Sequence, residues 1–230
     1  MNWRGSQAES RARYLAKFDA AEVERYDASV GHLARDDEDA YWSDLESLLP
    51  LREGTSVLDA GAGTGALCSV LSRRPGLAIT ALEPAPAMLA KLKGKAALHG
   101  VTAVEGFCDS LEDRGRFAAG RFDAIVSRQL VNGLYDPLTA FRNWRHWLSP
   151  HGTLVVIEGI YGRSAWTGTW QEEVDVLPLA ACQGTAATPY LLEIAGLHVE
   201  VVRWMEAVNA LLSTRTPRYV VVARKPARAS

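Results

Sequence analysis

The middle of the chain alternates short apolar runs with helical patterns, and this alternation constrains the fold more than any other feature. Strands are predicted at 56–59, 77–83, 102–106, 123–127 and 153–158, and two more at 197–205 and 218–224. Helices are predicted between the first five, at 66–74, at 86–100 and after Asp136-Pro137, whereas the last two strands have no crossover helix. This order predicts an α/β fold with a doubly wound, mostly parallel seven-stranded sheet and an antiparallel last strand.

The remaining segments carry weaker patterns. Residues 1–52 are predicted to form an N-terminal helical lid, in which the acidic run 36–39 suits a helix N-terminus and Pro50 ends that helix. Residues 53–230 are predicted to form the sheet-containing part of a single structural domain. A turn is predicted at 149–152, and residues 159–187 show no clear period.

Composition and charge exclude several classes of protein. Of the 230 residues, 48% are hydrophobic and 23% are charged, which is typical of an ordinary globular protein. This composition excludes a disordered chain, a coiled coil and a collagen-like fibre. The 25 Lys and Arg against 27 Asp and Glu give a net charge of −2, which leaves no basic excess for a nucleic-acid backbone. No run of 18 apolar residues is present, so we expect no membrane partner.

The cysteines indicate the compartment. Cys68, Cys108 and Cys182 are an odd number at wide spacing, which fits neither a disulfide framework nor a metal site. The N-terminal residues are charged and lack an apolar run, so we expect that they are not a signal peptide. We therefore expect a cytoplasmic protein without a bound metal.

A glycine-rich loop joins the first predicted strand to its helix. Residues 57–65 read Val-Leu-Asp-Ala-Gly-Ala-Gly-Thr-Gly, and glycine at such a junction lets the backbone approach a ligand beside a helix N-terminus. Gly61, Gly63 and Ala66 also satisfy the G-x-G-x-x-A dinucleotide pattern, with Glu83 at about the expected distance. The loop alone therefore leaves a dinucleotide open.

Three acidic residues distinguish a dinucleotide ligand from a nucleoside ligand without phosphates. Asp59 precedes the first glycine, where it would repel a pyrophosphate. Glu83 ends the second strand, where a carboxylate accepts hydrogen bonds from both ribose hydroxyls, and Asp109 follows the third, where an adenine amino group needs an acceptor. Acidic residues around a nucleoside suit a positively charged ligand without phosphates, and they suit NAD badly.

With these motifs the chain resembles the class I S-adenosylmethionine-dependent methyltransferases, a Rossmann-like family, over roughly residues 40–160, with the closing strands 197–224 also in order. The resemblance rests on the glycine motif 57–65, Ala-Leu-Glu-Pro at 81–84, Glu-Gly-Phe-Cys-Asp-Ser at 105–110, the strand 122–128 and the loop 148–154. One departure is His151, which stands where the family most often has glycine.

The resemblance implies S-adenosyl-L-methionine as cofactor and assigns its site. Gly61 and Gly63 would lie against the methionine part, Asp59 near its ammonium and Glu83 on the ribose. The adenine would contact the following residues: Pro84, Met88, Cys108, Asp109 and Ser110. Tyr26 and Arg128 complete the expected cofactor set, Arg128 through the methionine carboxylate.

The methyl acceptor is expected to meet aromatic side chains before and after the sheet. The candidates are Tyr14, Asn132, Tyr161, Trp166 and Trp170, whereas Tyr41, Trp42, Trp144 and Trp147 are expected to pack in the interior. His32 and Arg128 are the candidate catalytic residues, Arg128 either on an acidic group of the acceptor or on the cofactor, and the other four histidines are expected to be structural or solvated.

Together these features predict an enzyme that moves a methyl group to nitrogen or oxygen of a small, aromatic or apolar metabolite by in-line displacement. We expect it in secondary metabolism, as a monomer or homodimer. One alternative is a catalytically inactive cofactor-binding partner or sensor. Another is an NAD-dependent oxidoreductase, which would need a second substrate domain that the residues after the sheet are too few to supply.

Overall fold

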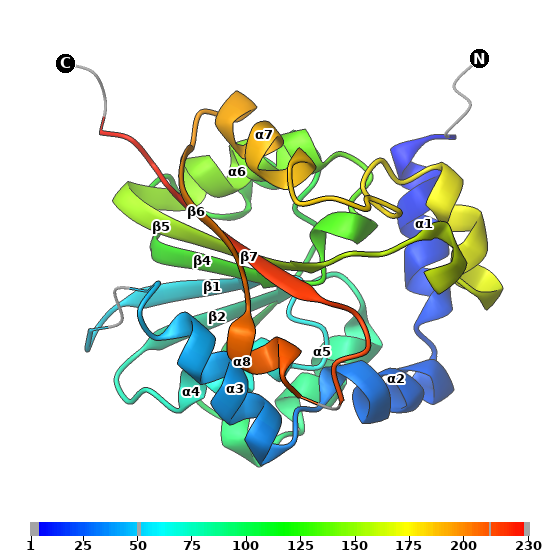
Figure 1. Ribbon diagram of the computed structural model, residues 1–230, viewed down its shortest axis with the longest axis horizontal. Coiled ribbons are helices and arrows are strands. Elements are labelled where there is room, and N and C mark those ends of the chain that lie inside the picture. Colours follow the sequence, from blue (N-terminus) through cyan, green and yellow to red (C-terminus); the bar gives the residue numbers. More distant parts are fainter. Residues whose placement is uncertain (1–4, 50–51, 212, 228–230) are drawn as a thin grey trace.

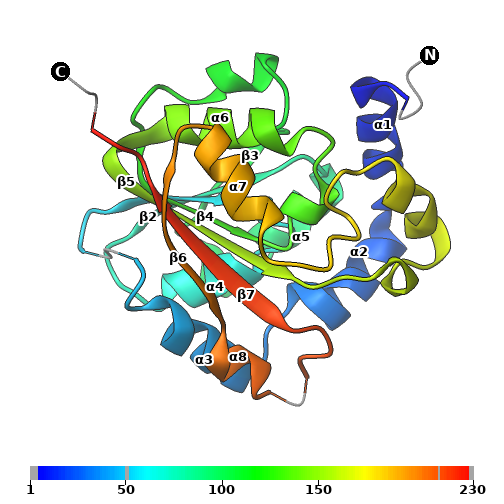
Figure 2. The same ribbon diagram turned by 45° about the horizontal axis from the view of Figure 1, so that its top comes forward.

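The computed structural model describes residues 5–49, 52–211 and 213–227, and seven strands of that chain form one sheet in the order β3-β2-β1-β4-β5-β7-β6 (Figure 1). The strands are β1 (Ser56–Ala60), β2 (Ala78–Glu83), β3 (Thr102–Glu105), β4 (Phe122–Arg128), β5 (Leu148–Gly159), β6 (His198–Trp204) and β7 (Arg218–Arg224). The first five pair in parallel, and β7 lies antiparallel between β5 and β6 (Figure 2). The predicted fold is confirmed.

Helices cover both faces of the sheet. They are α1 (Gln7–Lys17), α2 (Ala20–Tyr26), α3 (Arg35–Leu45), α4 (Ala66–Ser72), α5 (Pro86–Lys93), α6 (Pro137–Trp147), α7 (Ala187–Ile194) and the short α8 (Glu206–Asn209). Apolar side chains of α3, α4, α5 and α8 form one core with the sheet, and those of α6 and α7 form the other. None of the helices in the described ranges has the length and apolar character that a bilayer crossing requires.

Helix α6 shows how closely sequence and structure agree in the core. The Asp136 carboxylate accepts a hydrogen bond from the backbone N–H of Thr139, and Pro137 occupies the first turn, where no N–H is needed. Trp144 and Trp147 are fully buried, as their position on the apolar stripe predicts. Tyr41 on α3 is also buried, as expected, and Trp42 packs against the same core.

Two local predictions were wrong. The helix predicted over 86–100 ends at Lys93, and a separate 3-10 turn at Ala96–Leu98 buries Leu98. A Cβ on Gly65 would lie 2.5 Å from the Leu98 side chain, so this turn packs the chain onto the glycine loop instead of continuing the helix. The turn predicted at 149–152 lies within β5, where His151 takes a φ of 61° and the pairing with β4 shifts register.

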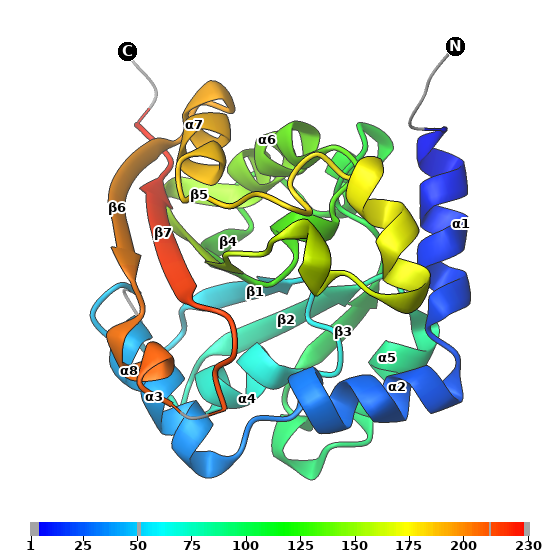
Figure 3. The same ribbon diagram turned by 45° about the vertical axis from the view of Figure 1, so that its right-hand side comes forward.

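The helices of residues 1–52 do not lie together. Helices α1 and α2 and the π-helical turn Asp27–Gly31 lie at one end of the sheet, beside the yellow segment that follows β5 (Figure 3). Helix α3 instead packs against α4 and α8 on a face of the sheet. Pro50, predicted to end the last of these helices, lies outside the described residues.

Candidate active site

The glycine loop after β1 adopts a backbone that side chains would not tolerate. Gly61 and Gly63 have φ of 73° and 55°, in the left-handed region that favours glycine. A Cβ on Gly61 would lie 2.8 Å from the Leu130 side chain, and one on Gly63 would lie 3.4 Å from the Tyr26 hydroxyl. Backbone N–H groups of Gly61 and Ala62 donate to the Leu82 carbonyl, so the loop is fixed to β2.

Glu83 ends β2 next to this loop and is 1% exposed. Its carboxylate accepts hydrogen bonds from the backbone N–H of Gly63 at 3.1 Å and of Ala85 at 2.9 Å, and from the Tyr14 hydroxyl at 3.2 Å. Burial raises the pKa of Glu83 to about 7, although these hydrogen bonds oppose the rise. The group is therefore a fixed hydrogen-bond acceptor whose charge changes near neutral pH.

Asp59, at the end of β1, is as deeply buried as Glu83. Its carboxylate accepts a hydrogen bond from the Cys68 thiol at 3.1 Å, and burial raises the pKa of Asp59 to about 6. Its side chain lines neither of the two cavities described next. Any effect of Asp59 on a ligand there therefore acts across the loop, by its charge or through water.

Two adjoining cavities lie over the carboxyl ends of the strands. The larger, of about 470 Å³, is lined by Gly61, Gly63, Glu83 and Met88 on its sheet side. The smaller is lined by Leu82, Pro84, Phe107, Cys108 and Asp109. Tyr14, Gly61, Leu130 and Gly133 line both. The two cavities are thus parts of one elongated site that runs from a mainly apolar pocket past Glu83 into a wider chamber.

The polar end of the smaller cavity is held by helix α1. Asp109 accepts hydrogen bonds from Arg11 at 2.7 Å and from the Tyr135 backbone N–H at 3.1 Å. Arg11 also pairs with Asp113, and its guanidinium lies 4.4 Å from the centre of the Phe107 ring. The N–H and hydroxyl of Ser110 both donate to Asp113, so Ser110, expected to contact a ligand, does not line the cavity.

Residues 58–156 match the family described as "Methyltransferase domain". A ubiquinone biosynthesis O-methyltransferase of Xanthomonas campestris is 33% identical over 101 residues, which are 44% of this chain and 41% of that protein. A trans-aconitate 2-methyltransferase of Deinococcus radiodurans is 33% identical over 127 residues, 54% of this chain and 46% of that protein. The matched residues 58–156 therefore carry a methyltransferase domain, and the chain is similar to the class I S-adenosylmethionine-dependent methyltransferases. It spans less than half the length of these curated relatives.

Solved methyltransferase structures share the fold over nearly the whole chain. An S-adenosylmethionine-dependent methyltransferase from Aquifex aeolicus has a TM-score of 0.64 and 20% identity, covering 90% of this chain and 99% of that one. The phosphoethanolamine N-methyltransferase 2 of Haemonchus contortus, solved with S-adenosyl-L-methionine, has a TM-score of 0.66 and 17% identity, covering 91% and 58%. The seven-stranded sheet is therefore an architecture shared with these structures.

The larger cavity has an aromatic wall. Ring centroids follow one another along it, from Tyr161 to Trp166 at 6.2 Å, on to Trp170 at 6.3 Å and to Phe18 at 5.8 Å. The wall also contains Tyr14 and Tyr26, each of which packs its ring against Phe18. The predicted aromatics of two distant segments thus meet around one chamber, together with Phe18, which the sequence did not single out.

Arg128, at the end of β4, lies between this chamber and a third cavity, which is polar and has a volume of about 110 Å³. Its guanidinium donates to the Tyr41 hydroxyl at 3.0 Å and to the Val30 carbonyl at 3.2 Å. Within the described parts of the chain, no carboxylate comes within ion-pair distance of it. A largely buried cation of this kind favours an anionic ligand.

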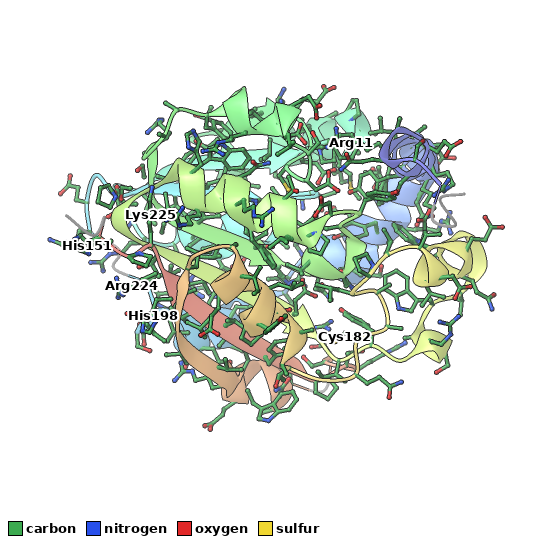
Figure 4. All side chains as sticks on the ribbon, turned by 90° about the horizontal axis from the view of Figure 1, so that it is seen from above. Arg11, His151, Cys182, His198, Arg224 and Lys225 are labelled. Atoms are coloured by element: carbon green, nitrogen blue, oxygen red, sulfur yellow. The ribbon has the colours of Figure 1, made fainter. Side chains whose placement is uncertain are left out.

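The two catalytic candidates have different positions. His32 lines the third, polar cavity and not the chamber, whereas Arg128 and Asn132 line the chamber. His151 and His198 lie at the end of the molecule opposite Arg11 (Figure 4). Gln129, which follows β4 between Arg128 and Asn132, also lines the chamber, and its φ of 54° is a feature that its place in the sequence did not indicate.

Proposed function

We propose that this protein transfers the methyl group of S-adenosylmethionine to nitrogen or oxygen of a small, planar, aromatic or apolar metabolite. The observation that carries the proposal is that the aromatic chamber opens directly onto Gly61, Gly63 and Glu83. The cofactor supplies a methyl group on a sulfonium, which reacts by in-line displacement, so placement of the acceptor is the main contribution of the protein.

The shape and charge of the elongated site fit this cofactor. The smaller cavity offers apolar contacts from Leu82, Pro84 and Phe107 for an adenine ring, with the Asp109 carboxylate at its edge. Glu83 would accept the ribose hydroxyls, and the bare backbone of Gly61 would lie along the methionine part. Two buried acids near a cationic ligand favour it, whereas they would repel the pyrophosphate of NAD.

Within this proposal, Arg128 holds the methionine carboxylate of the cofactor, because it is the largely buried cation of the chamber that lacks a carboxylate partner among the described residues. The α1 and α2 helices form the lid that covers the site. An acidic group on the acceptor is the other occupant for Arg128. The two are distinguished by whether Arg128→Ala weakens binding of the cofactor product or only that of the acceptor.

The described wall of the chamber contains no histidine, and its carboxylates are Glu22 and Glu83, of which Glu83 is assigned here to the ribose and not to a general base. His32 lies in the third, polar cavity. Burial raises the pKa of Tyr26 to about 12, so that its phenol keeps its proton. Aromatic faces attract a sulfonium by roughly 0.5–2 kcal/mol each, and Tyr26, Tyr161 and Trp166 provide such faces. Catalysis would then rest on proximity and on these rings.

A chamber of about 470 Å³ also supports an active enzyme over a binding partner or sensor, because space for an acceptor adjoins the glycine loop. We further propose a cytoplasmic enzyme of secondary metabolism, acting as a monomer or homodimer. The net charge of −2 supports the absence of a nucleic-acid partner.

The first test is calorimetric titration of the purified protein with S-adenosylhomocysteine, with NAD run in parallel. We expect micromolar binding of the nucleoside and none of NAD. Incubation with isotopically labelled S-adenosylmethionine and a panel of phenols, aromatic acids and aromatic amines then tests transfer. Binding of NAD alone would overturn the proposal, and nucleoside binding without transfer to any planar acceptor would favour the inactive alternative.

A further inference from the structure

The side chains of Tyr161, Gln129 and Arg218, which lie at or just beyond the ends of three different strands, meet beside the chamber. Tyr161 follows β5, Gln129 follows β4, and Arg218 begins β7. The Tyr161 phenol oxygen lies 2.6 Å from Nε2 of Gln129 and 2.7 Å from Nη1 of Arg218. The Arg218 guanidinium also lies 5.4 Å from the centre of the Tyr161 ring. The hydroxyl of Tyr161 is therefore fixed in place by two donors.

These two contacts determine what the Tyr161 hydroxyl is free to do. A phenol oxygen has two lone pairs and one proton. Both neighbours are N–H donors, since a guanidinium has no acceptor and the amide presents its nitrogen. The lone pairs are thus used, and the phenol proton has no acceptor among the described residues. Because Tyr161 lines the chamber, an oxygen or nitrogen lone pair in the chamber is the partner left for that proton.

The protonation state agrees with a donor. Burial raises the pKa of Tyr161, and the charge of Glu158 raises it further, while Arg218 and the Gln129 hydrogen bond oppose the rise. The phenol therefore remains protonated at neutral pH and donates a hydrogen bond instead of acting as a base.

The local backbone is shaped around this group. Gln129 has a φ of 54°, which a side-chain-bearing residue adopts at a cost of roughly 1–3 kcal/mol. A Cβ on Gly159 would lie 2.1 Å from Nη1 of Arg218 and 2.9 Å from the Tyr161 ring, so only glycine leaves room for the pair. These features indicate a built polar site rather than a chance contact.

We infer that the Tyr161 hydroxyl donates a hydrogen bond to an oxygen of the methyl acceptor, which makes the acceptor a planar molecule bearing a carbonyl, carboxylate or phenolate group. This inference rests on the proposed function and narrows its substrate class. Trp166, with its centroid 6.2 Å from that of Tyr161, provides an adjoining face for the ring of such a molecule. Gln129 and Arg218 are positioning residues that act through Tyr161.

The test uses Tyr161→Phe, which keeps the ring and removes the hydroxyl. Tyr190→Phe is the matched control, because Tyr190 is 63% exposed on α7. Binding is measured by quenching of tryptophan fluorescence in the presence of saturating S-adenosylhomocysteine. The probes are 4-hydroxybenzoate and 3,4-dihydroxybenzaldehyde, which carry such oxygens, and 1-naphthylamine, which carries no oxygen and whose nitrogen lone pair is delocalised into the ring and is therefore a poor acceptor.

We expect Tyr161→Phe to weaken binding of both oxygenated probes by about ten- to a hundredfold, the usual loss for a hydrogen bond to a charged or strongly polar group. Binding of 1-naphthylamine and of S-adenosylhomocysteine should change by less than about twofold, and Tyr190→Phe should match the wild type. If Tyr161→Phe does not fold, Gln129→Met serves instead. It removes one donor to Tyr161 and should weaken the oxygenated probes selectively.

Three results would overturn the inference: equal affinity of the oxygenated probes for the wild type and Tyr161→Phe, an equal loss for 1-naphthylamine, or no binding of either oxygenated probe at millimolar concentration. Failure of the proposed function is a separate result. It would appear as absent binding of S-adenosylhomocysteine to the wild-type protein, before any acceptor probe is added.

Discussion

The hydroxyl of Tyr14 on α1 donates a hydrogen bond to the Glu83 carboxylate at the end of β2, across 3.2 Å. Burial and the charge of Glu83 raise the pKa of Tyr14 well above its usual value, so it stays the donor when Glu83 ionises. The N-terminal helix is therefore bonded to the same carboxylate that is proposed to hold the ribose. Order in α1 and binding at Glu83 are coupled through this contact.

Replacement of Glu83 tests the ribose assignment. Glu83→Ala should weaken binding of S-adenosylhomocysteine by roughly 1.5–3 kcal/mol, as expected for hydrogen bonds to a charged group. The matched control is Glu193→Ala, at an exposed glutamate on α7. Calorimetry checks both variants, and a change at Glu83 of only a few tenths of a kcal/mol would remove this residue from the cofactor site.

The buried carboxyl groups predict an unusual dependence of stability on pH. Burial raises the pKa of Glu158 from 4.5 to about 7, and the unfolded chain restores the ordinary value. Between these two values the folded state binds more protons than the unfolded state. The free energy of unfolding should therefore fall as pH rises, by about 1.4 kcal/mol per pH unit from this group, until the loss is complete above its folded pKa.

Glu158→Gln isolates this effect, because the amide oxygen still accepts from the Val131 backbone N–H. Urea unfolding of the wild type and of this variant at several pH values should show a smaller decline for the variant and greater stability at neutral pH. Parallel curves for the two proteins would show that Glu158 ionises in the folded state at its ordinary pKa.

The glycine loop allows a comparison at constant backbone strain. Gly61 and Gly54 both have left-handed φ, of 73° and 82°, so alanine should destabilise the fold at either position by about 1–2 kcal/mol. A Cβ on Gly54 would have no neighbour within 4 Å, whereas one on Gly61 enters the site. We expect Gly61→Ala to lower S-adenosylhomocysteine affinity at least about tenfold and Gly54→Ala to leave it unchanged. Similar affinities in the two variants would contradict close contact at Gly61.

The contacts of Arg11 should control the opening of α1. Its guanidinium bonds Asp109 and Asp113, whose side chains are each 5% exposed. Arg11→Ala should raise hydrogen exchange of the α1 amides by about tenfold, since hydrogen bonds to charged groups contribute about 1.5–3 kcal/mol and Arg11 is partly solvated. Arg13→Ala, which removes only a 3.4 Å contact with Glu173, should have a smaller effect. Equal exchange in the two variants would exclude Arg11 as the main tether.

His151 should be replaceable with a gain in stability. It is exposed and has a φ of 61°, which glycine adopts without strain. His151→Gly should stabilise the fold by about 0.5–1 kcal/mol, the strain released less the added freedom of the unfolded chain. His99→Gly is the control, because His99 has no positive φ and should lose stability instead. Denaturant unfolding compares the two, and a loss of stability at position 151 would refute the strain argument.

The core of the fold could be predicted because its signals are local. The strand and helix alternation, the glycine loop and the cap of α6 by Asp136 each depend on residues adjacent in sequence. The end of α5 was missed because it depends on Leu98 packing against Gly65, a contact between distant residues. His151 stands where the family most often has glycine, and it has the left-handed backbone that glycine adopts without strain, although the sequence did not predict that conformation.

The acceptor side of the site could be predicted only by residue type. Tyr161, Trp166 and Trp170 stood out as aromatic residues in a segment without a period, but nothing in that pattern gives their order around a chamber. The partners of Tyr161 come from two strands that are far apart in sequence. His32 was nominated because it lies in a loop near the site, yet its ring lines the neighbouring cavity.

Because β7 is antiparallel to β5, its first residue, Arg218, pairs with Gly159 at the carboxyl end of β5. Arg218 therefore lies at the edge of the sheet where the parallel strands end. This part of the edge therefore comes from chain beyond residues 58–156, the residues that match the methyltransferase domain family. Gly61 and Glu83, which are proposed to contact the cofactor, fall inside this match, whereas Tyr161 and Arg218 fall outside it. Under the proposed function, substitutions in the late segments would therefore change the acceptor side of the site without touching the residues proposed to hold the cofactor.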